Sequence, residues 1–276
     1  MKEGFGHPDV FRIAPCLDVE KVRSIFPTLD EKVARLEEIQ GYTYTSPNVA
    51  RTAIIHRSAL VHWPTDRAGV FSNERLEFLG DSFLNHFAAF EAMNSQPHWQ
   101  EGDLSRLRAA IVGAENLAAK SRALGIGECL ILGRGEAMQP EDMQKNIYAD
   151  AFEAVTASLL LDGGSERAWQ WLARVFASDF VLGGEILKNF DAKSRFQQWV
   201  QGIVGAPPNY RHVGTESTHE VTRFIVAVFV GDIELARASA LNKRQASKSA
   251  AAQLLAQVES GELTADFIRQ AFLRKH

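Results

Sequence analysis

The sequence predicts a multidomain protein in which an all-α domain is followed by a small α+β domain. From Leu36 to Phe176, apolar residues recur at spacings of three and four, as on one face of a helix, and strand signals are almost absent. After residues 182–190 the pattern changes to strand-like runs and then to an alanine-rich helix. The 276 residues suffice for two hydrophobic cores, one in each domain.

These changes in pattern set the domain boundaries that we expect. Gly183-Gly184 marks a linker, because glycine pairs interrupt regular structure. The expected ranges are 1–30 for an unassigned N-terminal extension, 31–181 for the helical domain, 182–190 for the linker, 191–260 for the α+β domain and 261–276 for a C-terminal tail.

Helical periodicity within the first domain is clearest in two stretches, apart from the two acidic segments described below. The apolar positions of these stretches are Leu104, Leu107, Ile111, Leu117 and Leu124, and then Trp169, Trp171, Leu172 and Val175. Each set would form the buried face of a helix that packs against its neighbours.

The α+β domain is predicted to have the order α-β-β-β-α. Lys193–Gly202 has the pattern of a short helix, and Lys243–Val258 is alanine-rich and helical. Between them, Glu220–Val230 and Ile233–Ala240 have the character of strands, and Gly231-Asp232 is the hairpin turn that joins the two.

A purely acidic stripe distinguishes the helix predicted over Asn73–Ser82. At about 100° per residue, Glu74, Glu77 and Asp81 fall at about 0°, 300° and 340° around the helix axis. The opposite face carries the apolar residues Leu76, Leu79 and Phe83. Like charges at helical spacing repel one another, so this stripe requires compensation, and a hard divalent cation is the simplest candidate.

A second acidic pair repeats this arrangement. Asp150 and Glu153 are three residues apart on one predicted helix face; the far side carries Phe152, Val155 and Leu159, and the small residues Ala154 and Ala157 flank the acids. Two helices crossing at these faces would bring four carboxylates together, which is too much charge to leave unpaired in a cleft. Taken alone, each stripe is explained by an acidic face in solvent. The two together favour a metal site.

The first acidic segment also carries a resemblance to a known family. Asn73–Asn85, NERLEFLGDSFLN, resembles the signature segment of the ribonuclease III family, the endonucleases of double-stranded RNA. The resemblance extends in the family's order over residues 35–180, through Gly41–Tyr44, Ala53–Ala59, Glu101–Arg108, Leu132–Glu136 and Ala149–Gly164. The loop Ala137–Lys145 departs from the family, whose bacterial members carry a Ser-Gly-Gly-type loop at this point.

This resemblance implies a homodimeric endonuclease that depends on Mg²⁺, with Mn²⁺ as a substitute and with one metal ion or a pair in each site. It implies that Glu77, Asp150 and Glu153 are direct metal ligands. Asp81 is the fourth acid, and catalysis is assigned to Asp81 and Glu153. Glu74 and Glu101 are expected to support the site by lining its valley or orienting waters. The expected products have 5′-phosphate and 3′-hydroxyl ends with short 3′ overhangs, as in the processing of ribosomal, messenger and other structured RNAs.

The second domain resembles the double-stranded-RNA-binding domain. The residues expected to contact RNA are Gln197 and Gln198 on its first helix, His219 in the turn Ser217–Glu220, and Lys243, Arg244 and Lys248 at the start of its last helix. A helix N-terminus also binds phosphates, because its free backbone N–H groups donate hydrogen bonds and the positive end of the helix dipole attracts anions. Ser247 replaces the final cation of the family's pattern. Contacts of this kind read the shape of an RNA duplex across its minor grooves.

Phe78 is the one aromatic residue that we expect at the dimer interface. At about 40° it lies beside the carboxylates and away from the apolar face of its helix. An aromatic ring in that place requires a partner surface, and the family's homodimer offers a socket for this position.

Composition excludes several other classes of protein. Cys16 and Cys129 form no C-x-x-C pair, so neither a zinc site nor a disulfide framework is indicated, and two reduced thiols fit a cytoplasmic protein. The N-terminus lacks the signal-peptide pattern, and the longest apolar run, Phe224–Val230, is too short to cross a bilayer. Gly-rich phosphate loops are absent, and we expect neither a membrane association nor an organic cofactor. The net charge of −4 includes the acidic site and therefore does not argue against RNA.

Two alternative functions compete with this interpretation. A protein that holds structured RNA without cutting it would have lost at least one of the four acids, and all four are present. A helical metal phosphohydrolase acting on nucleotides would not need the second domain and would use His–Asp ligand pairs. His56, between apolar neighbours, is interpreted as a hydrogen-bonded, partly buried histidine, and Ser82 has no partners for a serine hydrolase.

Overall fold

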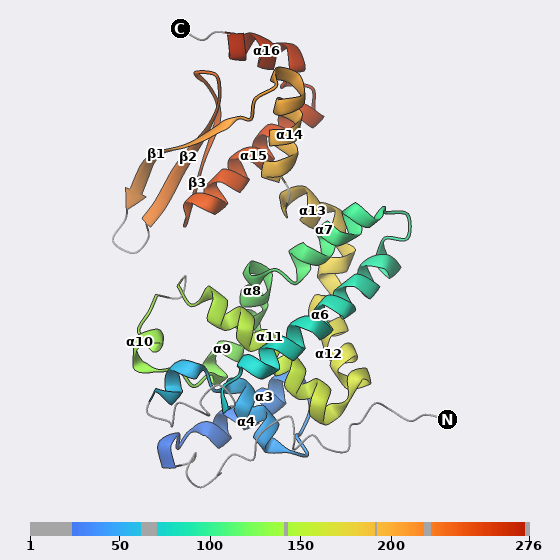
Figure 1. The fold of residues 1–276 in the computed structure, drawn as a ribbon, viewed down its shortest axis with the longest axis vertical. Coiled ribbons are helices and arrows are strands. Elements are labelled where there is room, and N and C mark those ends of the chain that lie inside the picture. Colours follow the sequence, from blue (N-terminus) through green and yellow to red (C-terminus); the bar gives the residue numbers. More distant parts are fainter. Residues whose placement is uncertain (1–23, 62–70, 141–142, 191, 218–221, 274–276) are drawn as a thin grey trace. The chain divides into compact units, whose positions relative to one another are not determined.

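A computed structural model describes residues 24–61, 71–140, 143–190, 192–217 and 222–273 (Figure 1). The chain divides into two compact units, Met1–Val181 and Leu182–His276. Within the described residues the first unit is helical and the second contains three strands between helices, which confirms the predicted fold class. Most of the segment expected as an N-terminal extension lies outside the described residues, and its last residues, Leu29 and Asp30, already belong to a helix.

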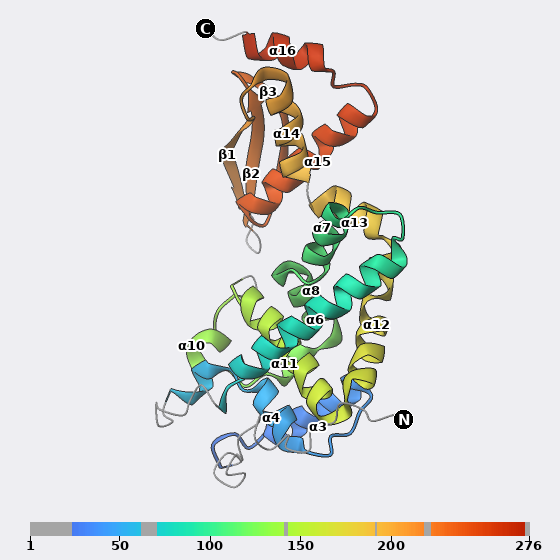
Figure 2. The ribbon, with the colours of Figure 1, turned by 45° about the vertical axis from the view of Figure 1, so that its right-hand side comes forward.

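The first unit is built from helices that pack around a central one. Its elements are α3 (Leu29–Gln40), α4 (Pro47–Ile54), the 3₁₀ helix η1 (Arg57–Leu60), α6 (Glu74–Ser95), α7 (Glu101–Ile111), α8 (Ala114–Leu124), α9 (Ile126–Cys129), α10 (Arg134–Ala137), α11 (Lys145–Gly163) and α12 (Ser165–Val181). Helix α11 lies in the middle and contacts α4, α6, α8 and α12 (Figures 1 and 2).

Helix α11 is buried on most of its circumference, which explains why its sequence is so apolar. The predicted core face, Phe152, Val155 and Leu159, is buried as expected, and the Phe152 ring stacks on Trp171 at 5.3 Å between centroids. On α6, Leu76 is buried while Leu79 and Phe83 are half-buried. The apolar stripes of both acidic helices therefore point into the core, and their acidic stripes are left at its edge.

Gly80 is the point at which α6 and α11 meet most closely. A Cβ at this position would lie 1.9 Å from the backbone oxygen of Glu153, so no other residue fits without moving a helix. Ala154 and Ala157, the small residues that flank the acids of α11, are also buried, but the role of Gly80 was not predicted from the sequence. The crossing places the acids of α6, one residue and three residues from Gly80, next to those of α11.

The second unit has helices on one face of an antiparallel sheet (Figure 2). Its elements are α13 (Gly183–Phe190), α14 (Ala192–Val204), β1 (Asn209–Ser217), β2 (Thr222–Val230), β3 (Ile233–Ala240), α15 (Lys243–Glu259) and α16 (Ala265–Leu273), with strand order β1-β2-β3. The predicted turn between β2 and β3 is present, and Gly231 adopts a φ of 59°, a left-handed conformation that favours glycine.

Two segments differ from what the sequence analysis expected. The segment 182–190, expected as a linker, contains α13. Its glycine pair lies at the start of this helix and therefore does not interrupt it. The segment 261–276, expected as a tail, contains α16. Ile268 and Ala271, three residues apart, are buried in the core of the second unit together with Phe196 and Val200 of α14. The apolar spacing that drives this packing is short and was not recognised in the sequence.

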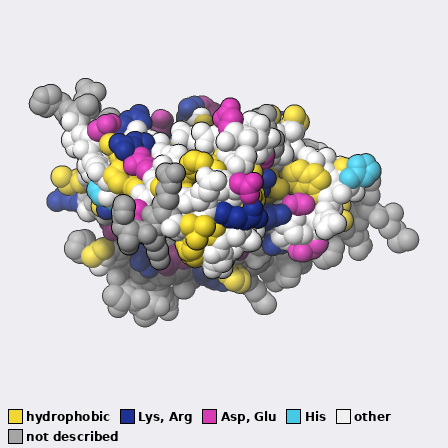
Figure 3. Space-filling model, turned by 90° about the horizontal axis from the view of Figure 1, so that it is seen from above, with side chains coloured by type: hydrophobic (Ala, Val, Ile, Leu, Met, Phe, Trp, Pro, Cys, Tyr) yellow, Lys and Arg dark blue, Asp and Glu magenta, His cyan; other side chains and the backbone are white. Residues whose placement is uncertain are grey.

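On the face drawn in Figure 3, Lys and Arg side chains are interspersed with Asp and Glu, and some apolar side chains also reach the surface. None of the described helices combines the length and the continuous apolar character that a membrane span requires.

Candidate metal centre

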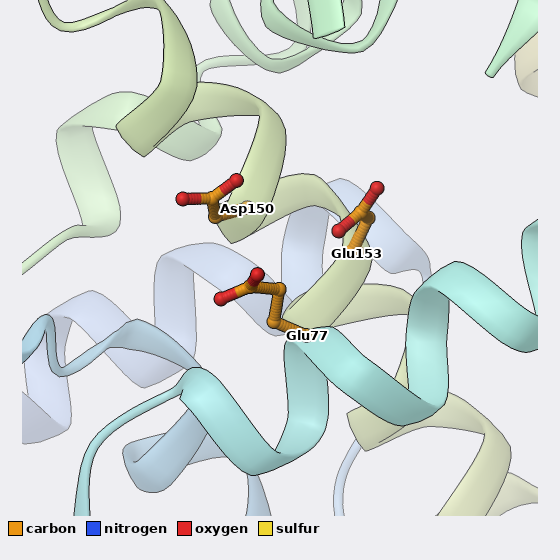
Figure 4. Close-up of side chains that lie close together, drawn as sticks. All are labelled: Glu77, Asp150 and Glu153. Atoms are coloured by element: carbon orange, nitrogen blue, oxygen red, sulfur yellow. The ribbon is translucent and has the colours of Figure 1, made fainter. Parts of the chain in front are cut away.

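Three carboxylates from two helices converge at the crossing of α6 and α11 (Figure 4). Glu77 comes from α6, and Asp150 and Glu153 come from successive turns of α11. One carboxylate oxygen from each lies within 4.8 Å of the others, and all three side chains are half-buried. We call these three residues the acid cluster. Oxygen ligands at this spacing fit a hard divalent cation.

Asp81, the fourth acid, lies beside the acid cluster and is exposed to solvent. Its Oδ1 accepts a hydrogen bond from Asn85 Nδ2 at 2.8 Å, and the same amide donates to the backbone oxygen of Asp81 at 2.9 Å. The negative charge of Asp81 contributes to the raised pKa values of Glu77 and Glu153, so it acts on the cluster from close by. Asn85 was not among the predicted site residues, although its i, i+4 spacing from Asp81 signals such a contact.

Burial and nearby negative charges raise the pKa values of the acid cluster. Burial raises the pKa of Glu153 to about 8, and the charges of Asp81, Asp150 and Glu77 add to this effect. The pKa of Glu77 is raised by burial and then by Asp150, Glu74 and Asp81. Burial also raises the pKa of Asp150. A divalent cation would counteract these shifts, because its positive charge favours the ionised form of each carboxylate.

The stability of the metal-free protein is expected to fall as the pH rises. Glu153 has an ordinary pKa of 4.5 and a pKa of about 8 in the fold, so between these values the folded state binds more protons than the unfolded state. Its contribution to stability is therefore complete below pH 4.5 and lost as the pH rises through 8. Mg²⁺ should raise the melting temperature more at pH 8 than at pH 6, because ligands bind metal after losing their protons.

Thermal denaturation with and without Mg²⁺ at a series of pH values measures this effect. The matched variant is Glu153→Gln, which keeps the shape and removes the titrating group, and its melting temperature should depend less on pH. Equal pH dependence in the two proteins would contradict the assignment of the raised pKa to Glu153.

Glu74 and Glu101, the two supporting acids, lie outside the acid cluster. Glu74 is 3.2 Å from Arg57 and accepts a hydrogen bond from Ser72 Oγ at 3.1 Å. Glu101 starts α7 and accepts a hydrogen bond from Ser105 Oγ at 2.7 Å. Helix α6 rises ~27 Å from Glu77 to its end before the chain reaches α7. Within one copy of the chain, Glu101 is therefore remote from the acid cluster, because the connecting helix is long and straight (Figure 1).

Glu101 lines a surface pocket of about 350 Å³ instead. We call it the α6–α7 pocket; the residues that line it are Ala89, Met93, Glu101, Leu104, Ser105 and Arg108. At the other end of α6, Phe78 is 77% exposed beside Glu77. A large aromatic side chain exposed to this degree agrees with the position expected for it on the acidic side of the helix.

Side-chain hydrogen bonds fix two further segments named in the sequence analysis. His56 is half-buried with Nδ1 2.7 Å from Ser58 Oγ, as the sequence analysis expected, and burial lowers its pKa. The loop that departs from the family pattern is closed by Gln144, whose Nε2 donates to the backbone oxygens of Glu136 at 2.8 Å and Gln139 at 2.9 Å.

The second unit presents most of the expected RNA-contacting residues on its surface. Gln198, Lys243 and Arg244 are exposed, and Gln197 and Lys248 are half-buried. Asn242 Oδ1 accepts the backbone N–H of Gln245 at 2.8 Å and so caps α15 at the end that carries these cations. Ser247 is only 8% exposed, which explains why this position cannot present a cation. His219 lies outside the described residues.

Comparison with known proteins agrees with this division into two units. Residues 46–180 match the Ribonuclease-III-like family, and residues 192–258 match the double-stranded RNA binding motif. Among solved structures, the nuclease domain of ribonuclease III from Campylobacter jejuni is 28% identical and covers 54% of this chain and 98% of its own, with a TM-score of 0.46.

Relatives of similar length align over both units. Ribonuclease 3 from Rhodopirellula baltica is 32% identical, and the alignment covers 85% of this chain and 86% of the relative. Ribonuclease 3 from Symbiobacterium thermophilum is 35% identical over 79% of this chain and 91% of the relative. The family match in each unit and the length of these alignments show that the chain belongs to the ribonuclease III family.

Proposed function

We propose that this protein is a homodimeric, Mg²⁺-dependent endonuclease that cuts double-stranded RNA in the cytoplasm. The observation that carries the proposal is the acid cluster, in which three half-buried carboxylates lie within 4.8 Å of one another in a chain that also has a double-stranded RNA binding motif. Mn²⁺ is a possible replacement because it shares the preference of Mg²⁺ for oxygen ligands.

The acid cluster would hold the metal, and Asp81 would complete the site from its exposed edge. When bound, Mg²⁺ would supply Lewis-acid chemistry, activating a water for attack on a phosphodiester and stabilising the 3′-oxygen that leaves. Glu77, Asp150 and Glu153 would bind the metal as carboxylates, and their raised pKa values mean that protons and the metal compete for them. Asn85 holds the Asp81 carboxylate in place, which limits the reorganisation needed when the site fills.

Attack by water on phosphorus, with the 3′-oxygen as leaving group, gives 5′-phosphate and 3′-hydroxyl ends. No protein nucleophile is needed. Two such sites in a symmetric dimer would cut one strand each and leave short 3′ overhangs. Substrates of this kind are the base-paired segments of ribosomal precursors and other structured RNAs.

The second unit would supply most of the affinity for the duplex. Lys243 and Arg244 are exposed at the N-terminus of α15, where the helix dipole also favours phosphates. Gln198 is exposed on α14, which covers the same face of the sheet as α15. Glutamine side chains suit 2′-hydroxyls and base edges in a minor groove, so recognition would depend on the shape of the duplex.

The dimer that we propose pairs α6 of one copy with α6 of the other. Phe78 near one end of α6 is exposed, and the α6–α7 pocket lies at its other end. An antiparallel pairing about a two-fold axis brings Phe78 of each copy to the pocket of the other, so each contact occurs twice. The same pairing would bring Glu101 of the second copy towards the acid cluster of the first, as its supporting role requires.

Cleavage of a generic RNA duplex by the purified chain tests the proposed function. Cleavage in Mg²⁺, none in a chelator, and ends that polynucleotide ligase joins are the expected results. Binding of the duplex without any cleavage in Mg²⁺ or Mn²⁺ would favour the RNA-holding alternative. Hydrolysis of nucleotides without action on RNA would favour the phosphohydrolase.

Removal of the second unit should weaken RNA binding and leave the nuclease unit folded. A chain ending at Val181 contains the whole first unit, so we expect it to remain helical and dimeric and to cut RNA only at low salt. Each phosphate contact that is lost lowers the slope of log affinity against log salt by about one unit.

Salt titrations of RNA binding by the full chain and by the shortened chain give this comparison. A full chain carrying Lys243→Ala and Arg244→Ala is the matched control, and its slope should fall between the two. If the full and the shortened chain have equal affinity and equal slope, the second unit is not the RNA anchor.

A further inference from the structure

Arg57 is held at the edge of the acid cluster by the backbone around it. It begins η1, and its neighbour His56 donates its backbone N–H to the oxygen of Ile131 at 3.0 Å. Ser58 Oγ accepts the backbone N–H of Gly133 at 2.9 Å. A Cβ on Gly133 would lie 2.4 Å from the backbone oxygen of Ser58, so the two segments touch. Arg57 is therefore attached to a rigid support.

The guanidinium of Arg57 lies among acidic groups while most of the side chain is open to solvent. Its Nη1 is 3.2 Å from Glu74 Oε1, and 71% of the side chain is exposed. The charge of Arg57 opposes the rise in the pKa values of Glu77 and Asp150, so it acts on two members of the acid cluster. Ser72 Oγ donates to the other oxygen of Glu74 at 3.1 Å and helps to fix the carboxylate that holds the arginine.

Folding stability is a weak reason for an arginine at this position. An ion pair this exposed contributes little, because water and salt screen it. The approach of a substrate is a stronger reason. Each phosphodiester of an RNA strand is an anion, and to be cut it must come close to the acid cluster and Asp81, which are anionic as well. A fixed cation at the edge of the cluster offsets that repulsion.

We propose that Arg57 binds a phosphate of the RNA strand next to the scissile bond and guides that strand into the acid cluster. This role rests on the proposed function and assigns a further positioning residue to it. A guanidinium has five N–H donors in a planar fork that matches two phosphate oxygens. With one arm on Glu74 and most of the side chain exposed, the fork retains donors for a phosphate. Its pairing with Glu74 also reduces the side-chain entropy lost on binding.

A cycle that combines protein variants with modified RNA tests this contact. Duplexes are prepared in which one phosphate at a time, on either side of the scissile bond, is a neutral methylphosphonate. Single-turnover cleavage of each duplex is measured for the full-length wild type, Arg57→Ala and Arg57→Lys. The loss of one charge-assisted contact is expected to slow cleavage by about tenfold. One modified linkage should slow the wild type, and Arg57→Ala should be slow on unmodified RNA without further loss at that linkage.

Arg57→Lys keeps the charge and loses the planar fork, so an intermediate rate is expected. Arg35→Ala is the matched control, since Arg35 is an exposed cation paired with Glu38 at 2.9 Å on α3, and it should cut as the wild type does. If the effects of Arg57→Ala and of the modified linkage on the cleavage rate multiply, or if Arg57→Ala cuts at the wild-type rate, Arg57 does not bind that phosphate. Either result would leave the proposed function itself untouched. Failure of the wild type to cut unmodified duplex would overturn the proposed function itself.

Discussion

The Glu153→Gln variant is expected to lose RNA cleavage by a factor of about a thousand or more, equivalent to ~4 kcal/mol of transition-state stabilisation. Burial and the negative charges of Asp81, Asp150 and Glu77 raise the pKa of Glu153 to about 8, so this side chain lies in an environment that favours a bound cation. A carboxylate that loses its proton is a strong ligand for Mg²⁺, whereas an amide is neutral and coordinates it weakly.

Binding of duplex RNA should survive the same substitution, because the expected RNA anchor is the second unit. Rates of cleavage in Mg²⁺ and affinities measured in a chelator separate the two properties. Glu166→Gln makes the same chemical change at an exposed position of α12 and should leave both unchanged. A Glu153→Gln protein that cuts at nearly the wild-type rate in Mg²⁺ would remove Glu153 from the metal site.

The residues of the acid cluster could be predicted from the sequence, because the spacing of residues along a helix predicts which side chains share a face. Spacings of three and four place Glu77 on one stripe of α6, and Asp150 and Glu153 on one stripe of α11, while the apolar positions opposite them require burial. That the two acidic faces supply one site was implied by the family resemblance, and the crossing of α6 and α11 brings the three carboxylates together.

The details of the site depend on contacts between helices and were harder to predict. Gly80 allows α6 and α11 to approach closely, because it contacts the backbone of Glu153. A single glycine in a helical pattern does not by itself predict such a contact. The family resemblance groups Glu101 with the acids of the site. In one copy of the chain, however, the length of α6 separates Glu101 from Glu77. Helix α16 was missed because two buried residues in a short segment do not establish a period.

Phe78→Glu is expected to convert the proposed dimer into monomers with little activity. Phe78 is 77% exposed in one copy of the chain, and burying such a side chain in a partner is worth ~1.5–3 kcal/mol. The contact occurs twice in a symmetric dimer, so its loss should weaken dimerisation by about 10²- to 10⁴-fold. The new carboxylate would also have to be desolvated beside Glu77, which adds to the cost. Phe78→Trp keeps a large aromatic ring and should be tolerated.

Sedimentation velocity over a range of concentrations measures the monomer–dimer equilibrium, and circular dichroism verifies that the variant remains helical. Leu273→Glu is the matched control, because Leu273 is 78% exposed on α16 in the second unit and gains the same charge. Met93→Glu, which alters the α6–α7 pocket, should dissociate the dimer as Phe78→Glu does, because each residue is one half of the same contact. If Phe78→Glu sediments as a wild-type dimer, the two copies associate through another surface, and Glu101 of one copy then has no route to the acid cluster of the other.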